Sequence, residues 1–333
     1  MLTSRTTLIA PALPRAAGLL IGYGLDRLLG DPRRGHPVAA FGRLAGALES
    51  RLHRDQRTRG AAYVAVLVGA TAGSGVLVER ATRNHPLVAT VATAAATWAV
   101  LGGRSLEWEA STVAAQLLGD DLPAARDQIT HLVGRDPSGL DAAELARACV
   151  ESVAENTSDA VVAPLFWGAV AGVPGLLGYR AANTLDAMVG HRSARYRRFG
   201  WAAARLDDVL NWIPARLAGL LVAGLGADPK AAAIAVRRDA GAHPSPNAGV
   251  VEAAFAGALG LRLGGVNRYG DVVEDRARLG SGRPPEPADI ARTTELASRV
   301  GVAAAVLAAA AALATAAALG WSASTVGGTR RGS

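Results

Sequence analysis

The 333-residue sequence predicts an all-α, polytopic integral membrane protein with polar loops at the membrane interface. Three observations predict this class: half of the residues are apolar, several apolar windows carry almost no charge, and arginines flank those windows. No βαβ rhythm and no hairpin dipeptide between alternating runs is evident, so we expect helix almost throughout. The alternative is a soluble bundle of buried alanine-rich helices, but the recurrence of apolar windows with charged flanks favours the membrane.

The apolar windows define the candidate spans. Residues 300–319 (VGVAAAVLAAAAALATAAAL) form the best one, because they contain no charge over roughly the ~20 residues that a membrane-crossing helix needs. Further candidates are residues 61–78, 87–103, 160–182, 209–226 and, more weakly, 8–29. We expect one membrane-embedded domain over residues 1–333. Its function should lie in the polar blocks 28–60, 104–159, 183–208 and 227–299.

The basic charge of the chain comes from arginine. The net charge is +7 with a pI near 10.4, and Lys230 is the sole lysine. Arginines beside apolar windows follow the positive-inside rule, so we expect no nucleic-acid partner. One loop is placed in the cytoplasm because it holds Arg33, Arg34, Arg43, Arg51, Arg54, Arg57 and Arg59. The lone Cys149 excludes an internal disulfide and a cysteine-based metal site.

The second basic loop creates a conflict in topology. If every window spans the membrane, residues 183–208 lie outside although they carry Arg192, Arg195, Arg197, Arg198 and Arg205. The conflict disappears if residues 160–182 enter and leave on the same side. We expect the turn of this re-entrant segment at residues 171–175 (AGVPG), because irregular backbone is tolerated at membrane depth where protein covers it.

A run of acids precedes this segment, in ESVAENTSDAVVAPLFW (residues 151–167). On a helix Glu151, Glu155 and Asp159 follow one another at intervals of four and fall on one face. Like charges at this spacing repel, which suggests a bound cation, and oxygen ligands suit Mg²⁺ with its phosphates. The alternative is a solvated lead-in to a membrane helix, with residues 156–158 as caps.

A second constellation follows the segment. Arg180, Asn183 and Asp186 are three residues apart and are therefore neighbours on a helix. Arginine is the preferred partner of carboxylate and phosphate oxygens, because its planar fork donates two parallel hydrogen bonds. Arg192 and Arg197 come next, and then Asp207 and Asp208. The alternative for this block is a basic loop that binds anionic lipid head groups.

Two further loops pair a His-Pro dipeptide with polar residues. Asp31 precedes His36-Pro37 and Arg43 follows it, whereas Asn247 and Asn267 follow His243-Pro244. A single His-Pro is usually a turn, but two beside clustered polar residues favour a functional role. The phosphate loop G-x-x-x-x-G-K-[ST], zinc-ligand spacings and the G-x-S-x-G elbow are absent from the sequence. If ATP is used, it must be held by arginines, backbone amides and a metal.

Taken together, these blocks resemble the adenosylcobinamide-phosphate synthase (cobalamin biosynthesis CobD/CbiB) family of integral membrane proteins. The resemblance covers most of residues 22–270. It is carried in order by GYGLDRLLGDPRRGHPVAAFGRL, ESVAENTSDAVVAPLFW, YRAANTLDAMVGHRSARYRRFGWAAARLDDVLNWIPARL and HPSPNAGVVEAAFAGALGLRLGGVNRYG. Minor departures from the family pattern fall at Ser158, Ala160 and His191.

The resemblance implies ATP- and Mg²⁺-dependent ligation of adenosylcobyric acid with (R)-1-amino-2-propanol or its O-phosphate. It also suggests other late cobalamin-pathway enzymes as partners, beside the lipid bilayer of the cell membrane. For this chemistry we assign the metal to Glu151, Glu155, Asp159, Asp207, Asp208 and Asp31. We assign phosphate or substrate binding to Arg180, Arg192, Arg197, Arg43, Asn247 and Asn267. We assign catalysis to His36, His243, Asp186 and Asn183. His36 or His243 would be the general base, because imidazole has a near-neutral pKa.

We expect the four polar blocks to converge on one pocket at the cytosolic face. The main rival is a membrane transporter, which predicts polar residues inside the spans and an internal repeat. A lipid head-group transferase would also use carboxylates and Mg²⁺ at the interface, but the D-G-x-x-A-R signature of one such class is absent. A structural partner of other corrinoid enzymes is the third alternative.

Overall fold

A computed structural model describes residues 12–326 except residues 33–34, 135, 192 and 270–271, and it does not describe the side chains of residues 266–275 and 316–326. The described chain is helical apart from one β-hairpin, which confirms the predicted all-α class. It divides into two compact units. The first unit comprises residues 1–101, 164–207 and 305–333, and the second comprises residues 102–163 and 208–304. Each unit is described by itself below.

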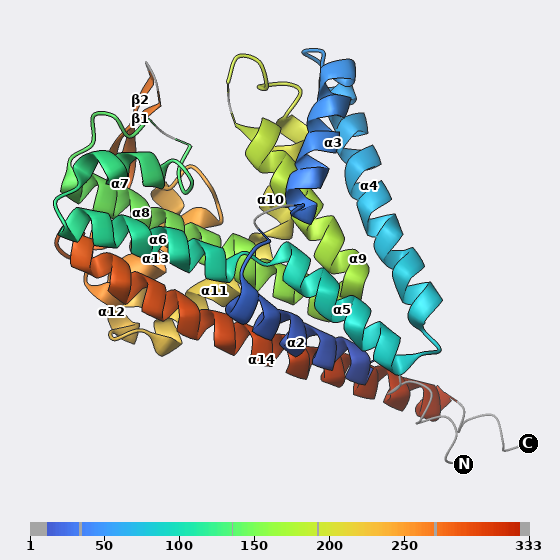
Figure 1. The fold of residues 1–333 in the computed structure, drawn as a ribbon. Helices are drawn as coiled ribbons and strands as arrows, with labels where there is room; N and C mark the ends of the chain where they lie inside the picture. The colour runs from blue at the N-terminus through green and yellow to red at the C-terminus, as the bar shows by residue number, and fades with distance from the viewer. Residues whose placement is uncertain (1–11, 33–34, 135, 192, 270–271, 327–333) are drawn as a thin grey trace, which may run out of the picture. The chain divides into compact units, whose positions relative to one another are not determined.

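The first unit begins with α2 (Ala12–Leu29), α3 (Pro37–Leu52), α4 (Arg57–Thr82) and α5 (Pro86–Val100). It continues with α9 (Ala163–Leu185), the π-helix η2 (Asp186–Gly190) and most of α10 (Trp201–Leu210), and it ends with the second part of α14 (Pro287–Val326). Helices α2 and α5 lie side by side (Figure 1). Small residues permit this approach, since a Cβ at Gly18 or Gly22 would meet α5 within 2.6 Å.

The second unit contains α6 (Gly103–Leu118), α7 (Leu122–Ile129), α8 (Ala142–Thr157) and the π-helix η1 (Ser158–Val162). They are followed by α11 (Trp212–Leu225), α12 (Pro229–Asp239), the 3₁₀ turn η3 (Ala240–Ala242) and α13 (Ala248–Leu259). Strands β1 (Leu263–Tyr269) and β2 (Val272–Leu279) pair antiparallel. The hairpin was not predicted, although Gly270-Asp271 between two extended runs is a hairpin signal.

Four described segments are long and apolar enough to cross a membrane, or five if the pair Trp201–Leu210 and Trp212–Leu225, bent by 46°, is one span. The four are Arg57–Thr82, Pro86–Leu118, Ala142–Gly190 and Pro287–Thr315. The described part of the weaker window, residues 12–29, forms α2, whose three charged residues, Arg15, Asp26 and Arg27, keep it out of this group. The chain is therefore a multi-pass membrane protein by length and composition.

Helix α9 reverses direction at Gly172. This residue has φ +64° and ψ −146°, a conformation that favours glycine. A Cβ on Gly168 would lie 2.7–3.0 Å from Leu19 and Leu176, and a Cβ on Gly175 would lie 2.2 Å from the carbonyl oxygen of Trp167. Residues eight apart in a continuous helix are separated by about 12 Å. The halves of α9 therefore fold against each other, which confirms the predicted turn.

Charged side chains cap both ends of this break. Glu79 of α4 accepts a hydrogen bond from the Val173 amide at 3.0 Å, and Arg15 of α2 donates to the Ala169 carbonyl oxygen at 3.4 Å. The two side chains are 3.5 Å apart. A carboxylate thus meets the amide end of one half-helix and a guanidinium meets the carbonyl end of the other, as the helix dipole favours.

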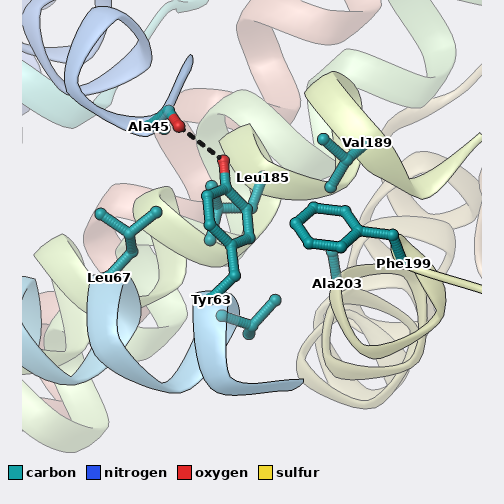
Figure 2. Close-up of a cluster of buried hydrophobic side chains, with 8 residues drawn as sticks. Ala45, Tyr63, Leu67, Leu185, Val189, Phe199 and Ala203 are labelled. Carbon is teal, nitrogen blue, oxygen red and sulfur yellow. Dashed lines mark hydrogen bonds between the residues drawn. The ribbon is translucent and has the colours of Figure 1, made fainter. Parts of the chain in front are cut away.

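An apolar cluster fixes the other end of α9 (Figure 2). Tyr63 and Leu67 of α4 pack there against Leu185, Val189 and the chain that follows. The Tyr63 hydroxyl donates to the Ala45 carbonyl oxygen at 3.2 Å, so the ring is buried without an unpaired polar atom. The remaining members of the cluster are Ala45, Val64, Phe199 and Ala203. This packing ties the end of α9 to α3, α4 and α10.

The two basic loops of the first unit lie at the same end of that unit. Glu49, near the end of α3, accepts hydrogen bonds from Arg195 at 3.0 Å and from the Tyr196 hydroxyl at 2.9 Å. The His53 ring lies 3.1 Å from the Arg195 carbonyl oxygen. Direct contact between the loops agrees with the expectation that both lie on one side of the membrane.

Candidate functional site

In the first unit, a guanidinium, an amide and a carboxylate form a hydrogen-bonded chain. Arg180 Nη1 donates to Asn183 Oδ1 at 3.4 Å, and Asn183 Nδ2 donates to Asp207 Oδ1 at 3.2 Å. Helix α9 carries the first two residues and α10 carries Asp207, which is 9% exposed. We call Arg180, Asn183, Asp186 and Asp207 the α9–α10 cluster. The sequence predicted all four as site residues, and the structure brings three of them into direct contact.

Asp186 occupies the start of η2, three residues after Asn183. Its carboxylate lies against Gly190, where an added Cβ would come within 1.8 Å of Oδ1. The absence of a side chain at Gly190 therefore makes room for this carboxylate. Asp186 is half-buried at the start of the basic loop.

Arg180 also borders an apolar cavity of about 130 Å³ within the first unit. Its walls come from α3, α4, the end of α5 and α9, and they include Pro37 and Thr184. An apolar space bordered by one guanidinium resembles the usual composition of a small-molecule site, in which a few polar groups set the orientation.

The two predicted histidines share one geometry. His36 Nδ1 accepts the Val38 amide at 3.0 Å, and its Nε2 lies 3.2 Å from Asp31. His243 Nδ1 accepts the Ser245 amide at 3.0 Å, and its Nε2 lies 3.5 Å from Glu252. The arrangement is not a necessary result of the dipeptide, because His85, before Pro86, makes no such cap.

This geometry argues against either histidine as a general base. A neutral ring whose Nδ1 accepts a hydrogen bond carries its hydrogen on Nε2 and has no free lone pair. In addition, burial lowers the pKa of His243. These rings fit the role of fixing their loops and facing a carboxylate better than the role of removing a proton from a substrate.

In the second unit, Glu151 has a structural role that the sequence did not reveal. It accepts hydrogen bonds from Arg147 at 3.1 Å and from the Gly264 amide at 2.9 Å, while Arg147 donates to the Gly264 carbonyl oxygen at 2.8 Å. Both side chains are largely buried. The pair thereby ties the first residues of β1 to α8.

The three predicted acids differ in environment. Glu151 is buried, Glu155 is exposed, and Asp159 is half-buried in η1, where π-helical turns replace the regular α-helical spacing. Within the described residues, no three His, Cys, Asp or Glu side chains are grouped closely enough to hold a metal ion. The metal role of the three acids stays a prediction, and Arg147 already compensates the charge of Glu151.

The side chain of Asn247 contacts the backbone of Asp208. Asn247 Nδ2 donates to the Asp208 carbonyl oxygen at 2.8 Å, and Arg216 donates to Asn247 Oδ1 at 3.1 Å. Asn247 therefore fixes the start of α13 to α11 and to the end of α10. Arg43 and Arg197 are exposed. Arg192 and the side chain of Asn267 lie outside the described residues.

The structure gives contacts to several residues for which the sequence pattern indicated no role. Glu252 is 4% exposed inside the apolar helix α13, and a single acid in such a helix is a signal that was available in the sequence. Glu49 and the Arg15–Glu79 pair gave no such signal, because their partners are distant in the chain.

Comparison with known proteins identifies the family. The family described as CobD/Cbib protein matches residues 19–297. The chain belongs to the CobD/CbiB family. It is 53% identical over 288 residues to the cobalamin biosynthesis protein CobD of Mycobacterium tuberculosis strain H37Rv, covering 85% of this chain and 91% of that protein. No solved structure matches.

Two further relatives carry the same name. The CobD protein of Rhodobacter capsulatus is 45% identical over 295 residues, which cover 85% of this chain and 93% of the relative. That of Geobacter metallireducens is 47% identical over 264 residues, covering 76% of this chain and 82% of the relative. In this CobD/CbiB family member, the matched range includes the α9–α10 cluster and both histidine loops.

Proposed function

We propose that this CobD/CbiB family member catalyses ATP-dependent amide formation between adenosylcobyric acid and (R)-1-amino-2-propanol or its O-phosphate, in cobalamin biosynthesis. Family membership supports the pathway. The observation that carries the reaction is the chain of Arg180, Asn183 and Asp207 beside an apolar cavity. In this chain, the guanidinium of Arg180 can bind a phosphate, and the carboxylate oxygens of Asp207 can bind a metal ion close by.

The reaction needs those groups. Joining a carboxylate to an amine in water is uphill, so the carboxylate must first be activated, here by transfer of the terminal phosphoryl group of ATP to a carboxylate oxygen, which releases ADP. The amine nitrogen then attacks the acyl carbon, the C–N bond forms, and phosphate leaves as the nitrogen loses its proton. Phosphoryl transfer depends mainly on positioning and on electrostatic stabilisation.

The α9–α10 cluster fits Mg²⁺. This ion is commonly held by one or two carboxylates together with substrate phosphates, so a third acid is not required. Asp207 supplies one carboxylate, and it lies in the same unit as Arg180. Bound Mg²⁺ would neutralise charge on the transferring phosphoryl group.

The other side chains then have separate tasks. Arg180 binds a phosphate or carboxylate oxygen with its guanidinium. Asn183 holds the orientation of Asp207 through their hydrogen bond. We assign proton removal from the ammonium group to Asp186, since the lone pairs of His36 and His243 are already engaged. The cavity beside Arg180 would take an apolar edge of the corrinoid substrate.

We place this chemistry on the cytoplasmic side of the cell membrane. Both arginine-rich loops of the first unit lie at one end of it and contact each other through Glu49. The positive-inside rule assigns such an end to the cytoplasm, where ATP is available. Accessibility of a cysteine introduced at exposed Arg197 to a membrane-impermeant reagent, in intact cells and in lysed cells, tests this orientation.

The reaction is tested with the purified protein in detergent, incubated with adenosylcobyric acid, ATP, Mg²⁺ and each amine in turn. Mass spectrometry should show the amide product with one of the two amines, and omission of ATP should abolish it. Purified, folded protein that forms no amide with either amine, while it takes up a corrinoid when reconstituted into liposomes, would contradict the proposal.

Corrinoid uptake without amide formation would favour a membrane transporter. One observation supports this alternative function. Arg15 and Glu79 place opposite charges at the break of α9, within helices that include a candidate span. Broken helices with charged partners are common in transporters. In our proposal this pair stabilises the turn, and Glu79→Gln should therefore lower the amount of folded protein without a specific effect on uptake.

A further inference from the structure

A basic surface lies in the first unit where α3 ends and α4 begins. It consists of four exposed arginines, Arg51, Arg54, Arg57 and Arg59, which we call the α4 basic patch. Among the residues that the structure describes, no acidic side chain forms an ion pair with any of the four. None of them belongs to the α9–α10 cluster or to the histidine loops, so the proposed amide ligation does not use this surface.

The acids nearest in the chain are directed to the second basic loop instead. Glu49 accepts hydrogen bonds from Arg195 at 3.0 Å and from the Tyr196 hydroxyl at 2.9 Å. Asp55 lies 3.9 Å from Arg198. Each of these carboxylates is therefore shared with an arginine of that loop, and the α4 basic patch keeps its positive charge.

The start of α4 lacks the groups that usually neutralise a helix N-terminus. Arg57 and Arg59 stand in the first turn, which contains no acid, and the side chain of Gln56 makes no capping hydrogen bond. The first amides of a helix carry partial positive charge, and cations beside them are unfavourable. Two arginines at an uncapped start therefore favour an anion from outside the chain.

The patch lies at the edge of a candidate membrane span. The uncharged run of α4, residues 60–78, begins directly after Arg59. Trp201 of α10 is 43% exposed, and the guanidinium of Arg57 lies 5.4 Å from the centre of its ring. Exposed tryptophan beside an apolar run is typical of the level of the lipid head groups. The anion available at that level is a phospholipid phosphate.

We propose that the α4 basic patch binds anionic phospholipid head groups at this end of the first unit. Arg57 and Arg59 pair with a lipid phosphate beside the first amides of α4, and Arg51 and Arg54 add attraction to the anionic surface. Each arginine near such a surface strengthens binding about fivefold. A lipid fits better than an acidic protein, because the Arg57–Trp201 contact holds the patch at the depth of the head groups.

The test measures lipid binding without ATP or corrinoid, so its result does not depend on the proposed reaction. Delipidated protein in detergent is titrated with palmitoyl-oleoyl phosphatidylglycerol or with phosphatidylcholine of the same acyl chains, and bound lipid is counted by native mass spectrometry. We expect the wild type to bind the anionic lipid about tenfold or more tightly than the zwitterionic lipid. Added salt should weaken this preference, since exposed charges are screened.

Variants at the two ends of α4 separate the patch from a general effect of charge. Arg57→Gln with Arg59→Gln should lower the preference for the anionic lipid more than tenfold. Gln56→Asp, which supplies an acidic cap, should lower it without removing an arginine. Arg80→Gln with Arg83→Gln is the matched control, because both residues are exposed at the other end of α4, where the helix carbonyl groups oppose an anion. The control should keep the preference.

The unfolding temperature shows which variants are folded, and only these are compared. Equal binding of the two lipids by the wild type, an unchanged preference in the folded patch variants, or an equal loss in the control would overturn the proposal. A polyglutamate peptide serves as a probe for the other kind of partner. Its binding through the patch, with no preference between the two lipids, would assign the surface to an acidic protein and would equally overturn the proposal.

Discussion

Asn183 donates a hydrogen bond of 3.2 Å to Asp207, although 24 residues separate them in the chain. The bond joins the end of α9 to α10 across the basic loop, and Arg180 extends it by a further contact. This relationship is central to the proposed site because it connects a helix beside the cavity to a buried carboxylate.

The first prediction concerns that bond. Asp207→Asn should reduce the rate of amide formation about 100-fold or more, as expected when a group that stabilises transition-state charge is lost. Asn183→Ala should have a smaller effect of about tenfold, since it removes only an orienting partner. The measurement is ATP-dependent amide formation by purified protein, and Asp228→Ser, which keeps a cap on α12, is the control. Full activity of Asp207→Asn would remove this carboxylate from the site.

The second prediction concerns the stability contributed by Glu151. Glu151→Gln leaves the largely buried Arg147 without its ionic partner, and we expect a loss of about 3 kcal/mol in the free energy of unfolding. The double variant Glu151→Gln, Arg147→Met should recover part of the loss. The unfolding temperature in detergent gives the measurement, and a single variant as stable as wild type would contradict the structural role.

Glu155 gives the third prediction, because its side chain is exposed and its replacement should not affect folding. If Glu155 binds the metal, as the sequence predicts, Glu155→Gln should abolish amide formation while the protein stays in the membrane at a normal level. The two quantities are measured on the same membrane preparation. Unchanged activity would exclude Glu155 from the metal site.

The fourth prediction is a dependence of stability on pH through His243. Its pKa is lowered from 6.5, chiefly by burial and in part by Arg276, while Glu151 and the Ser245 contact oppose this shift. The unfolded chain therefore binds a proton at a higher pH than the folded chain does. The contribution of neutral His243 is complete above pH 6.5 and is lost as pH falls from 6.5 through the lowered pKa.

The corresponding measurement is the unfolding temperature between about pH 8 and about pH 5, a range that spans the ordinary histidine pKa. His243→Asn keeps an acceptor for the Ser245 amide but does not titrate, so its unfolding temperature should fall less than that of wild type. Parallel curves for the two proteins would show that another group is responsible.

The fifth prediction concerns the turn of α9. Gly172→Ala places a Cβ at a positive φ and within 1.9 Å of Glu79 Oε1, so it should cost about 1–3 kcal/mol in strain and disturb the capping carboxylate. Gly69→Ala in α4 is the matched control, because no atom lies within 4 Å of its added Cβ. Yield of folded protein and unfolding temperature should fall for the first variant alone.

The membrane class and the apolar segments of the long helices could be predicted from the sequence. Uncharged windows such as residues 61–78 lie within long helices, since apolar composition over such a length leaves few alternatives. The turn at residues 171–175 was also predictable, because glycine and proline mark a break and the arginines after it required a return. The β-hairpin was not predicted, as its strands lack the clear apolar alternation that identifies most strands.

The candidate site was predictable only in part. The sequence alone determined which residue types are present and which are helical neighbours, as for Arg180 and Asn183, because that spacing is set by local backbone geometry. Only the tertiary structure decided that Asn183 contacts Asp207, that Glu151 accepts the Gly264 amide, and that both histidine rings have their lone pairs engaged. The physical reason is that burial and long-range hydrogen bonds depend on which helices pack together, and a linear pattern of charges does not contain that information.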